Sequence, residues 1–189
     1  MSLIPRTENG EFCPSLFDNV MTRGVTMETT GVIMKYKISG LKAEPFAHLF
    51  GQSESYLKNH NAIRQTVECY PGYPDRISLC DIPVGETALL INHIYQPADS
   101  PFFGTHAIYV WEGCTRQGIY LNALPEVMQS RILSLRAFNK EHFLIVADIA
   151  EGKLAENLIG LLFSDSQVSY IQIHNAKQGC YLCCAERCE

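Results

Sequence analysis

Two apolar segments separated by one short loop restrict the fold of this chain more strongly than any other stretch. The segment ETALLINHIY (86–95) is apolar at odd and even positions between Ala88 and Ile91, which is typical of a central strand covered on both faces. The segment GTHAIYVW (104–111) follows a loop that is too short for a parallel crossover. The two segments are therefore expected to pair as antiparallel strands.

Three regions carry the helical period. Residues 43–59 predict one or two short helices, broken near Gly51 and restarted after an N-cap at Ser53. A second helix is expected to begin at Pro125, with an apolar stripe formed by Met128, Ile132 and Leu135. Amphipathic spacing at 154–162 indicates a further helix. The chain is therefore expected to hold three to four short helices.

Strand-like segments lie around these helices. Besides the pair described above, strands are expected at residues 34–39, 62–68, 76–82, 133–138, 143–149, 168–175 and 180–188. Several links between them are too short for the crossovers that parallel strands need. Strands and helices also alternate without a regular strand–helix–strand repeat. The patterns together predict a single-domain α+β fold with a mostly antiparallel sheet.

The length of 189 residues fits one domain of ordinary size. Residues 1–33 are rich in turn-forming residues and only weakly periodic, so they are expected to form a weakly structured N-terminal extension. Met34 opens the first strand-like segment. The folded domain is therefore expected to cover 34–189, with Met34 as its natural start.

Charge and apolar patterning narrow the possible partners. A formal net charge of −5 at pH 7 disfavours nucleic acid, which basic surfaces bind. No apolar run approaches the roughly 18 residues that a membrane-spanning helix needs. Residues 1–33 do not read as a secretory signal, so the eight cysteines are expected to stay reduced in the cytoplasm. A small molecule is the expected partner, while any cofactor and the oligomeric state are left open.

Three histidines, His93, His106 and His174, stand near the ends of expected strands. If these strand ends converge, their imidazoles could bind a divalent metal or carry protons near neutral pH. No His-x-His or His-Glu-x-x-His spacing enforces a metal site, and the alternative is that each ring secures its own loop. We expect His93 and His106 to share one cleft beside the 96–104 loop, with Arg76 at its rim.

Three further polar residues are candidates for ligand binding in that cleft. Arg76 could hold a carboxylate or phosphate in a bidentate grip, or it could pair with an acidic residue inside the fold. Asn92 precedes His93, and Asp99 lies in the loop that follows the same strand. Asp99 could instead stabilise its own loop through an Asx-type turn.

Cys180 lies shortly after His174, and a tight turn between them could bring thiol and imidazole together as catalytic partners. A cation beside a cysteine lowers its pKa and makes the thiolate available as a nucleophile. The alternative is a buried cysteine that acts as a small apolar residue. The nearby Cys183, Cys184 and Cys188 lack the second, separated cysteine pair of structural zinc sites and are interpreted as extra thiols.

Short motifs spread along the chain are shared, in the same order, with one known family. They are Pro71-Gly72-Tyr73-Pro74, Arg76-Ile77-Ser78-Leu79, Gly85-Glu86, Asn92-His93, Gln96-Pro97-Ala98-Asp99-Ser100-Pro101, His106-Ala107-Ile108, Leu135-Arg136-Ala137-Phe138, Ala147-Asp148, His174-Asn175-Ala176 and Gly179-Cys180-Tyr181. Through them the region from Met34 to about Cys188 resembles a bacterial family known as domain of unknown function 1203. The resemblance implies a shared fold and a shared pocket, and it implies no reaction.

Three functional classes remain open at this point. The first is a cytosolic protein with a small-ligand or metal-binding pocket built from strand-end His, Arg and Asn residues. The second is a non-catalytic interaction or structural domain. The third is a cysteine/histidine-dependent enzyme that uses Cys180. Convergence of Arg76 with the three histidines on one cleft would favour the first class, whereas scattered positions would favour the second.

Overall fold

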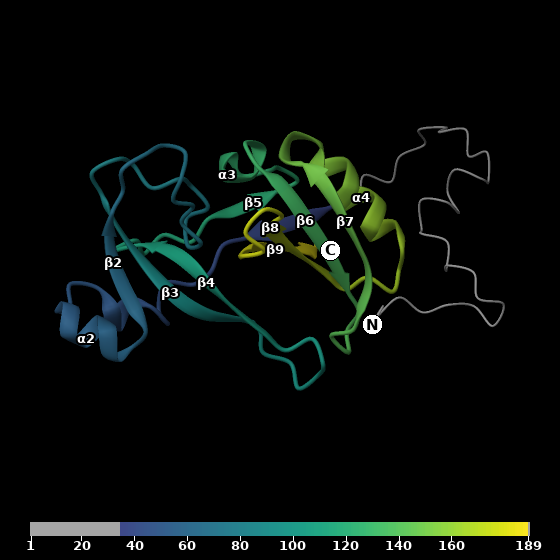
Figure 1. Cartoon of the computed structure of the whole chain (residues 1–189). Helices are drawn as coiled ribbons and strands as arrows, with labels where there is room; N and C mark the ends of the chain where they lie inside the picture. Colours follow the sequence, from purple (N-terminus) through teal and green to yellow (C-terminus); the bar gives the residue numbers. More distant parts are fainter. Residues whose placement is uncertain (1–34, 189) are drawn as a thin grey trace. The chain divides into compact units, whose positions relative to one another are not determined.

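Two antiparallel sheets and a few short helices make up residues 35–188, which are the residues that the computed structural model describes (Figure 1). The strands are β1 (Tyr36–Ser39), β2 (Ala62–Thr66), β3 (Thr87–Gln96), β4 (Gly104–Trp111), β5 (Ile119–Leu121), β6 (Ile132–Phe138), β7 (Leu144–Glu151), β8 (Tyr170–Asn175) and β9 (Tyr181–Arg187). The helical segments are the 3-10 turns η1 (Ala47–Leu49) and η2 (Gly152–Leu154) and the α-helices α2 (Glu54–Asn59), α3 (Glu126–Gln129) and α4 (Ala155–Ser164). The α+β class with a mostly antiparallel sheet is confirmed. The expectation for residues 1–33 lies outside the described residues.

The smaller sheet has three strands, with β3 between β2 and β4. Its register places Leu89 opposite Val110 and His93 opposite His106. Leu89 and Val110 are fully buried in a core shared with η1 and α2. The antiparallel pairing predicted for these two segments is therefore confirmed. Ser53 caps α2 by accepting a hydrogen bond from the Tyr56 backbone N–H, as its position in the sequence predicted.

The larger sheet has six strands in the order β5-β1-β9-β8-β6-β7. Helix α4 packs against β6 and β7 (Figure 1). Ile159 and Phe163 of this helix are fully buried in one core with Leu135 of β6 and Ile171 of β8. The amphipathic helix expected near 154–162 is confirmed, because its apolar face is the face that covers the sheet.

The prediction of a strand at 76–82 is wrong, because this segment forms a turn. The Asp75 carboxylate accepts hydrogen bonds from the backbone N–H groups of Ile77 and Ser78 and from the Ser78 hydroxyl, at 2.6–3.2 Å. These bonds curl the chain into a turn, and Leu79 takes a positive φ of 61°. The apolar residues of this segment alternate as in a strand. However, the Asp75 side chain accepts hydrogen bonds from backbone N–H groups that would otherwise have been available to a neighbouring strand.

The helix expected from Pro125 is much shorter than its apolar stripe. It ends at Gln129, and Ile132 and Leu135 belong to β6 instead. Strand β6 pairs with both β7 and β8, so sheet hydrogen bonding overrides the helical period in this segment. The helical content of the described residues is accordingly lower than predicted. The sequence also gave no sign of β5, a three-residue strand that pairs with β1.

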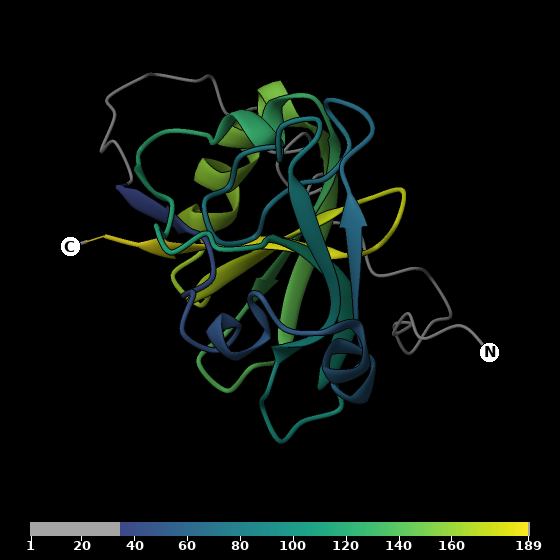
Figure 2. The ribbon, with the colours of Figure 1, turned by 90° about the vertical axis from the view of Figure 1, so that its left-hand side faces the viewer.

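The two sheets meet where β4, an edge strand of the smaller sheet, contacts β9 of the larger one. Figure 2 looks from the side of the smaller sheet, and the yellow β8–β9 strands run across behind it. The segment around Asp75 and Arg76 bonds to β4: the Arg76 N–H donates to the Tyr109 carbonyl oxygen at 3.3 Å, and the Trp111 N–H donates to Asp75 Oδ1 at 2.9 Å. The segment 76–82, which was predicted as a strand, thus begins at the junction between the sheets.

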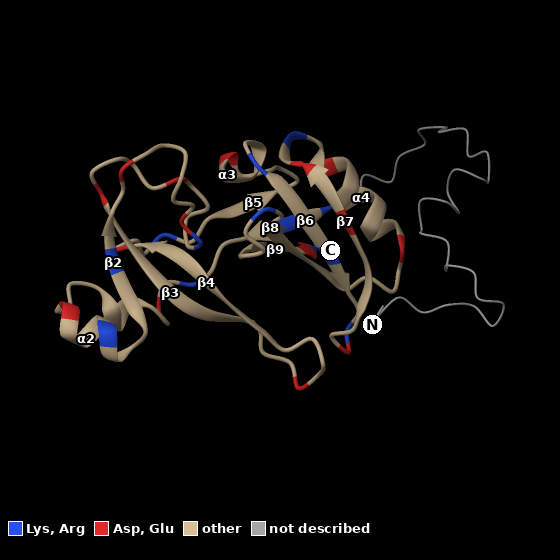
Figure 3. Ribbon diagram, viewed as in Figure 1, with Lys and Arg blue, Asp and Glu red and all other residues tan. Residues whose placement is uncertain are grey.

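The charges of residues 35–188 are mixed in sign, and the cysteines of this region are not paired. Acidic and basic residues are interspersed along the ribbon (Figure 3). All seven cysteines in this part of the chain are free thiols. None of its helices is long and apolar enough to cross a membrane.

Candidate functional site

A cavity of about 260 Å³ lies between the free edge of β4, the segment around Arg76 and the turn that joins β8 to β9. Three of the residues singled out in the sequence, Arg76, His106 and Cys180, line it. The complete lining consists of Gly72, Pro74, Arg76, Leu90, His106, Ala107, Ile108, Tyr109, Arg131, Asn175, Gln178 and Cys180. Five separate parts of the sequence therefore supply this one cavity.

Arg76 lies in the wall of the cavity rather than at its rim, with a relative exposure of 1%. Its Nε donates to the Tyr181 carbonyl oxygen at 2.9 Å and its Nη1 to that of Pro74 at 2.7 Å. Its Nη2 lies 3.0 Å from the sulfur of Cys180. No carboxylate of the described residues lies within ion-pair distance of it; Asp81 pairs with Arg131, and Asp75 acts on its charge only from a longer distance. Burial lowers the pKa of Arg76, and the Cys180 sulfur opposes that change.

Cys180 and Asn175 face each other across the turn between β8 and β9. The Asn175 N–H donates to the Cys180 carbonyl oxygen at 2.9 Å, and Asn175 Nδ2 lies 3.2 Å from the Cys180 sulfur. Gly179 closes the turn with a φ of 75°, a conformation that glycine adopts without strain. The turn therefore holds a thiol of 7% exposure between the Asn175 amide and the Arg76 guanidinium.

Of the paired histidines on β3 and β4, only His106 lines the cavity. The ring of His93 packs against Phe46 and Tyr181, with centroid distances of 5.8 and 6.1 Å. Burial, followed by the charge of Arg76, lowers the pKa of His93, so this ring is neutral at pH 7. The two strands bring the histidines to opposite positions of the ladder, but their rings have different neighbours.

His174 is fully buried and makes its hydrogen bonds away from Cys180. Its Nδ1–H donates to the Gly179 carbonyl oxygen at 3.0 Å, and its Nε2 lies 3.3 Å from Gln172 Oε1. Burial, followed by the charge of Arg136, lowers the pKa of His174 to about 4. The structure therefore does not pair this imidazole with the thiol, whose neighbours are Arg76 and Asn175 instead.

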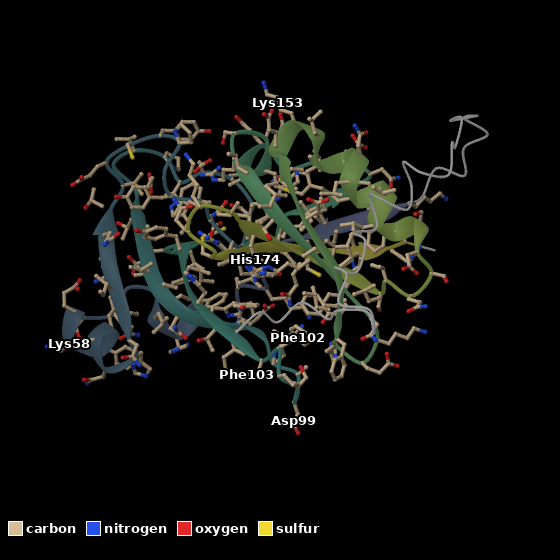
Figure 4. The ribbon with its side chains drawn as sticks, turned by 45° about the vertical axis from the view of Figure 1, so that its right-hand side comes forward. Lys58, Asp99, Phe102, Phe103, Lys153 and His174 are labelled. Atoms are coloured by element: carbon tan, nitrogen blue, oxygen red, sulfur yellow. The ribbon has the colours of Figure 1, made fainter. Side chains whose placement is uncertain are left out.

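Asn92 and Asp99 do not line the cavity. Both are exposed. Asp99 projects from the outer tip of the loop between β3 and β4, whereas His174 lies in the interior (Figure 4). The loop that was expected to border the cleft contributes none of the cavity's lining residues.

A second, more polar cavity of about 350 Å³ adjoins the first and shares Gly72, Arg131, Asn175 and Gln178 with it. Arg131 donates to both carboxylate oxygens of Asp81, at 2.6 and 2.9 Å, so its charge is neutralised by that pair. Lys177 is exposed and makes no ion pair within residues 35–188. None of the described residues that line either cavity is acidic, although the chain has a net charge of −5.

The two cavities are lined by hydrogen-bond donors and one thiol. Within residues 35–188, no group of three or more His, Cys, Asp or Glu side chains could hold a metal ion. The cavities instead present a guanidinium, an ammonium and two amides, which suit a carboxylate or a phosphate. Cys180 adds a buried free thiol to this set.

Four residues that line the cavities were not predicted from the sequence: Asn175, Arg131, Lys177 and Gln178. A signal for Asn175 was present, because residues that flank a hairpin turn lie opposite each other, and Asn175 and Cys180 flank the turn between β8 and β9. Arg131 carried no such signal, since its partner Asp81 lies in a distant part of the chain. Lys177 and Gln178 belong to the turn itself and became site residues only through the fold.

Comparison with known proteins gives a family and no activity. A family model described as a protein of unknown function (DUF1203) matches residues 72–187. Neither the curated proteins nor the solved structures gave a match to the chain. The matched region contains every residue that lines the first cavity. Since it spans more than half of the 189 residues, the chain belongs to the DUF1203 family.

Proposed function

We propose that this protein binds a small organic anion, whose carboxylate enters the cavity between Arg76 and Cys180. The observation that carries the proposal is a buried guanidinium in a cavity wall without a carboxylate partner among the described residues. Burying an unpaired cation is costly, and a bound anion would remove that cost.

The guanidinium has donors left for a ligand. Arginine carries five N–H groups, and three of them meet the acceptors on Tyr181, Pro74 and Cys180. Nη1 and Nη2 each keep one further N–H without an acceptor among residues 35–188. Two N–H groups on neighbouring nitrogens match the geometry of a carboxylate.

The outer cavity supports the same ligand class. Lys177 offers an ammonium group, and Asn175 and Gln178 offer amide N–H groups. No acidic side chain among the lining residues repels an anion. The inner cavity of about 260 Å³ is near the lower end of ligand pockets, which hold roughly 300–1,000 Å³, so the ligand is small.

The proposed location is a bacterial cytoplasm. Thiols stay reduced in that compartment. Such a location would keep Cys180 free beside the bound anion.

Thermal unfolding with malonate tests the proposal, with the neutral diamide malonamide as the matched ligand control at equal ionic strength. At about ten times its Kd, malonate should stabilise the fold by about 1.4 kcal/mol. A domain of this size then unfolds about 3–6 °C higher. Malonamide should give no comparable rise, because it has no charge for Arg76 or Lys177.

Two lysine variants separate binding in the cavity from a general salt effect. Lys177→Gln removes the outer cation and should reduce the malonate response. Lys58→Gln changes an exposed lysine on α2 that lines neither cavity, and should keep the full response (Figure 4). Equal stabilisation by malonate and malonamide, or an equal malonate response in the two variants, would contradict the proposal.

A further inference from the structure

We infer that Cys180 is a nucleophile, held as a thiolate by Arg76 and Asn175, that attacks a small carboxylate-bearing electrophile in the cavity. The inference rests on the proposed anion site and adds a covalent step to it. A lone cysteine would not support it, but two hydrogen-bond donors at this sulfur and an unbonded buried oxygen beside it do.

The two polar groups nearest to the sulfur are both donors. Arg76 Nη2 lies 3.0 Å from Cys180 Sγ, and Asn175 Nδ2 lies 3.2 Å from it. A guanidinium nitrogen cannot accept a proton, and neither can an amide NH₂ group. A thiol S–H would therefore have no acceptor in either neighbour, whereas a thiolate accepts both hydrogen bonds.

The charge balance of the wall points the same way. The Arg76 guanidinium is buried, and no described carboxylate forms an ion pair with it. The sulfur of Cys180 is its only neighbour that can become an anion within hydrogen-bond distance. Asp75, the residue before Arg76, acts on the guanidinium charge only from beyond ion-pair distance. Arg76 therefore favours negative charge on the Cys180 sulfur, while Lys177 of the outer cavity and the remaining Arg76 N–H groups are left for the ligand carboxylate.

Asn175 supplies the observation that points to a ligand. Its Oδ1 is the only buried side-chain nitrogen or oxygen atom of residues 35–188 without a hydrogen-bond partner. Asn175 is 6% exposed and lines both cavities. Buried amide oxygens almost always accept a hydrogen bond. A bound molecule with a hydroxyl or amide N–H beside its carboxylate would donate the hydrogen bond that this oxygen lacks.

Cys183 provides a contrast within the same strand. It is fully buried, and burial raises its pKa well above the ordinary value. Its sulfur contacts Met128 Sδ at 3.9 Å and no cationic group. The pair of N–H donors at its sulfur distinguishes Cys180 from this second buried cysteine.

The groups that share the cavity with Cys180 come from three other elements. Arg76 comes from the segment before β3, His106 and Tyr109 come from β4, and Arg131 comes from the link between α3 and β6. None of these groups is a carboxylate. Asp75, the nearest acidic residue to Arg76 in the chain, is buried but does not line the cavity.

The covalent step balances without an oxidant or a reductant. The lone pair of the Cys180 thiolate forms a bond from sulfur to the electrophilic carbon of the substrate. The bond from that carbon to its leaving group breaks, and the leaving group departs with the bonding electrons. No proton is released from the sulfur, because it is already ionised, and the substrate carboxylate stays bound by Arg76 and Lys177.

Alkylation rates of single cysteines test the nucleophile. The folded full-length protein is treated with iodoacetamide at pH 6.5, quenched at intervals and digested, and mass spectrometry follows each cysteine. The exposed Cys69 serves as the reference in the same chain. An ordinary thiol is only about 1% ionised at this pH, and a thiolate of lower basicity is less nucleophilic, so Cys180 should react roughly tenfold faster than Cys69.

The same measurement with iodoacetate tests the anion site separately. In this reaction the sulfur displaces iodide from a carbon that carries a carboxylate. The rate ratio of iodoacetate to iodoacetamide should be higher at Cys180 than at Cys69, and malonate should slow the reaction at Cys180 alone. A fast reaction of Cys180 with iodoacetamide but no preference for iodoacetate supports the nucleophile and overturns the proposed anion site.

Variants and a pH profile identify the groups responsible. Asn175→Ala should slow alkylation of Cys180 by roughly tenfold at pH 6.5 and shift its rate profile to higher pH. Asn157→Ala, at an exposed position on α4, is the matched control and should change neither. If Cys180 in the parent protein reacts no faster than Cys69, or if Asn175→Ala leaves its pH profile unchanged, the inference is overturned.

Discussion

Replacing Arg76 with methionine should cost this fold a large part of its stability. Methionine has a similar length and no donors, so the substitution keeps volume in the cavity wall while it removes three hydrogen bonds. Two of these bonds end on the backbone carbonyls of Pro74 and Tyr181, which lie on different sides of the junction between the sheets. The guanidinium therefore links the segment before β3 to the start of β9.

The expected magnitude follows from what is left behind. Each buried carbonyl that loses its donor costs about 1–3 kcal/mol. The Cys180 sulfur also loses its cation, although relief of the buried guanidinium offsets part of the total. Removal of one partner from a buried charged contact typically costs about 3–5 kcal/mol, and we expect Arg76→Met to fall in that range. A domain of this size then unfolds roughly 6–20 °C lower.

Thermal unfolding followed by circular dichroism is the assay, with chemical denaturation as a second measurement. Arg116→Met is the matched control, because Arg116 is exposed and its side chain makes no hydrogen bond or ion pair within the described residues. The control should shift Tm by no more than about 2 °C. If Arg76→Met and Arg116→Met have the same Tm, Arg76 does not link the two sheets in the way its contacts indicate.

Three further predictions concern other parts of the chain. Lowering the pH from 7 to 4.5 should destabilise the fold through His174, because the unfolded chain takes up this proton near 6.5 and the folded chain only near 4. The free energy of unfolding therefore decreases as the pH is lowered through this window, by about 2 kcal/mol. The decrease should be smaller in His174→Asn, and equal pH slopes of Tm in the two proteins would refute this assignment. Gly40→Ala should lower Tm, because a Cβ there would collide with the Ile77 carbonyl oxygen, whereas Gly160→Ala has open space and should not; similar effects of the two would argue against the close approach. A chain that starts at Met34 should keep its Tm within about 5 °C, and a larger drop would show that residues 1–33 contribute to the fold.

The sequence alone determined several of the local elements of this protein, though not the turn at 76–82, the short helix α3 or the strand β5. Strands β3 and β4 were predictable because their apolar pattern and their short loop require antiparallel pairing. The hairpin of β6 and β7 and the amphipathic helix α4 were predictable for the same kind of reason. In each case the evidence is the spacing of apolar residues along one continuous segment, and this spacing shows which face of the segment is buried. The family resemblance added the expectation of a shared pocket without showing which residues would line it.

Tertiary structure decided the site, and it did so through contacts between distant segments. Arg76 reaches Cys180 and Tyr181 more than a hundred residues along the chain, and no local pattern records such a meeting. The same contacts gave Cys180 a guanidinium and an amide as neighbours in place of the imidazole that its sequence position suggested. A residue's periodic position fixes the face on which it lies, whereas its chemical partner depends on which element packs against that face, and packing is a property of the whole fold.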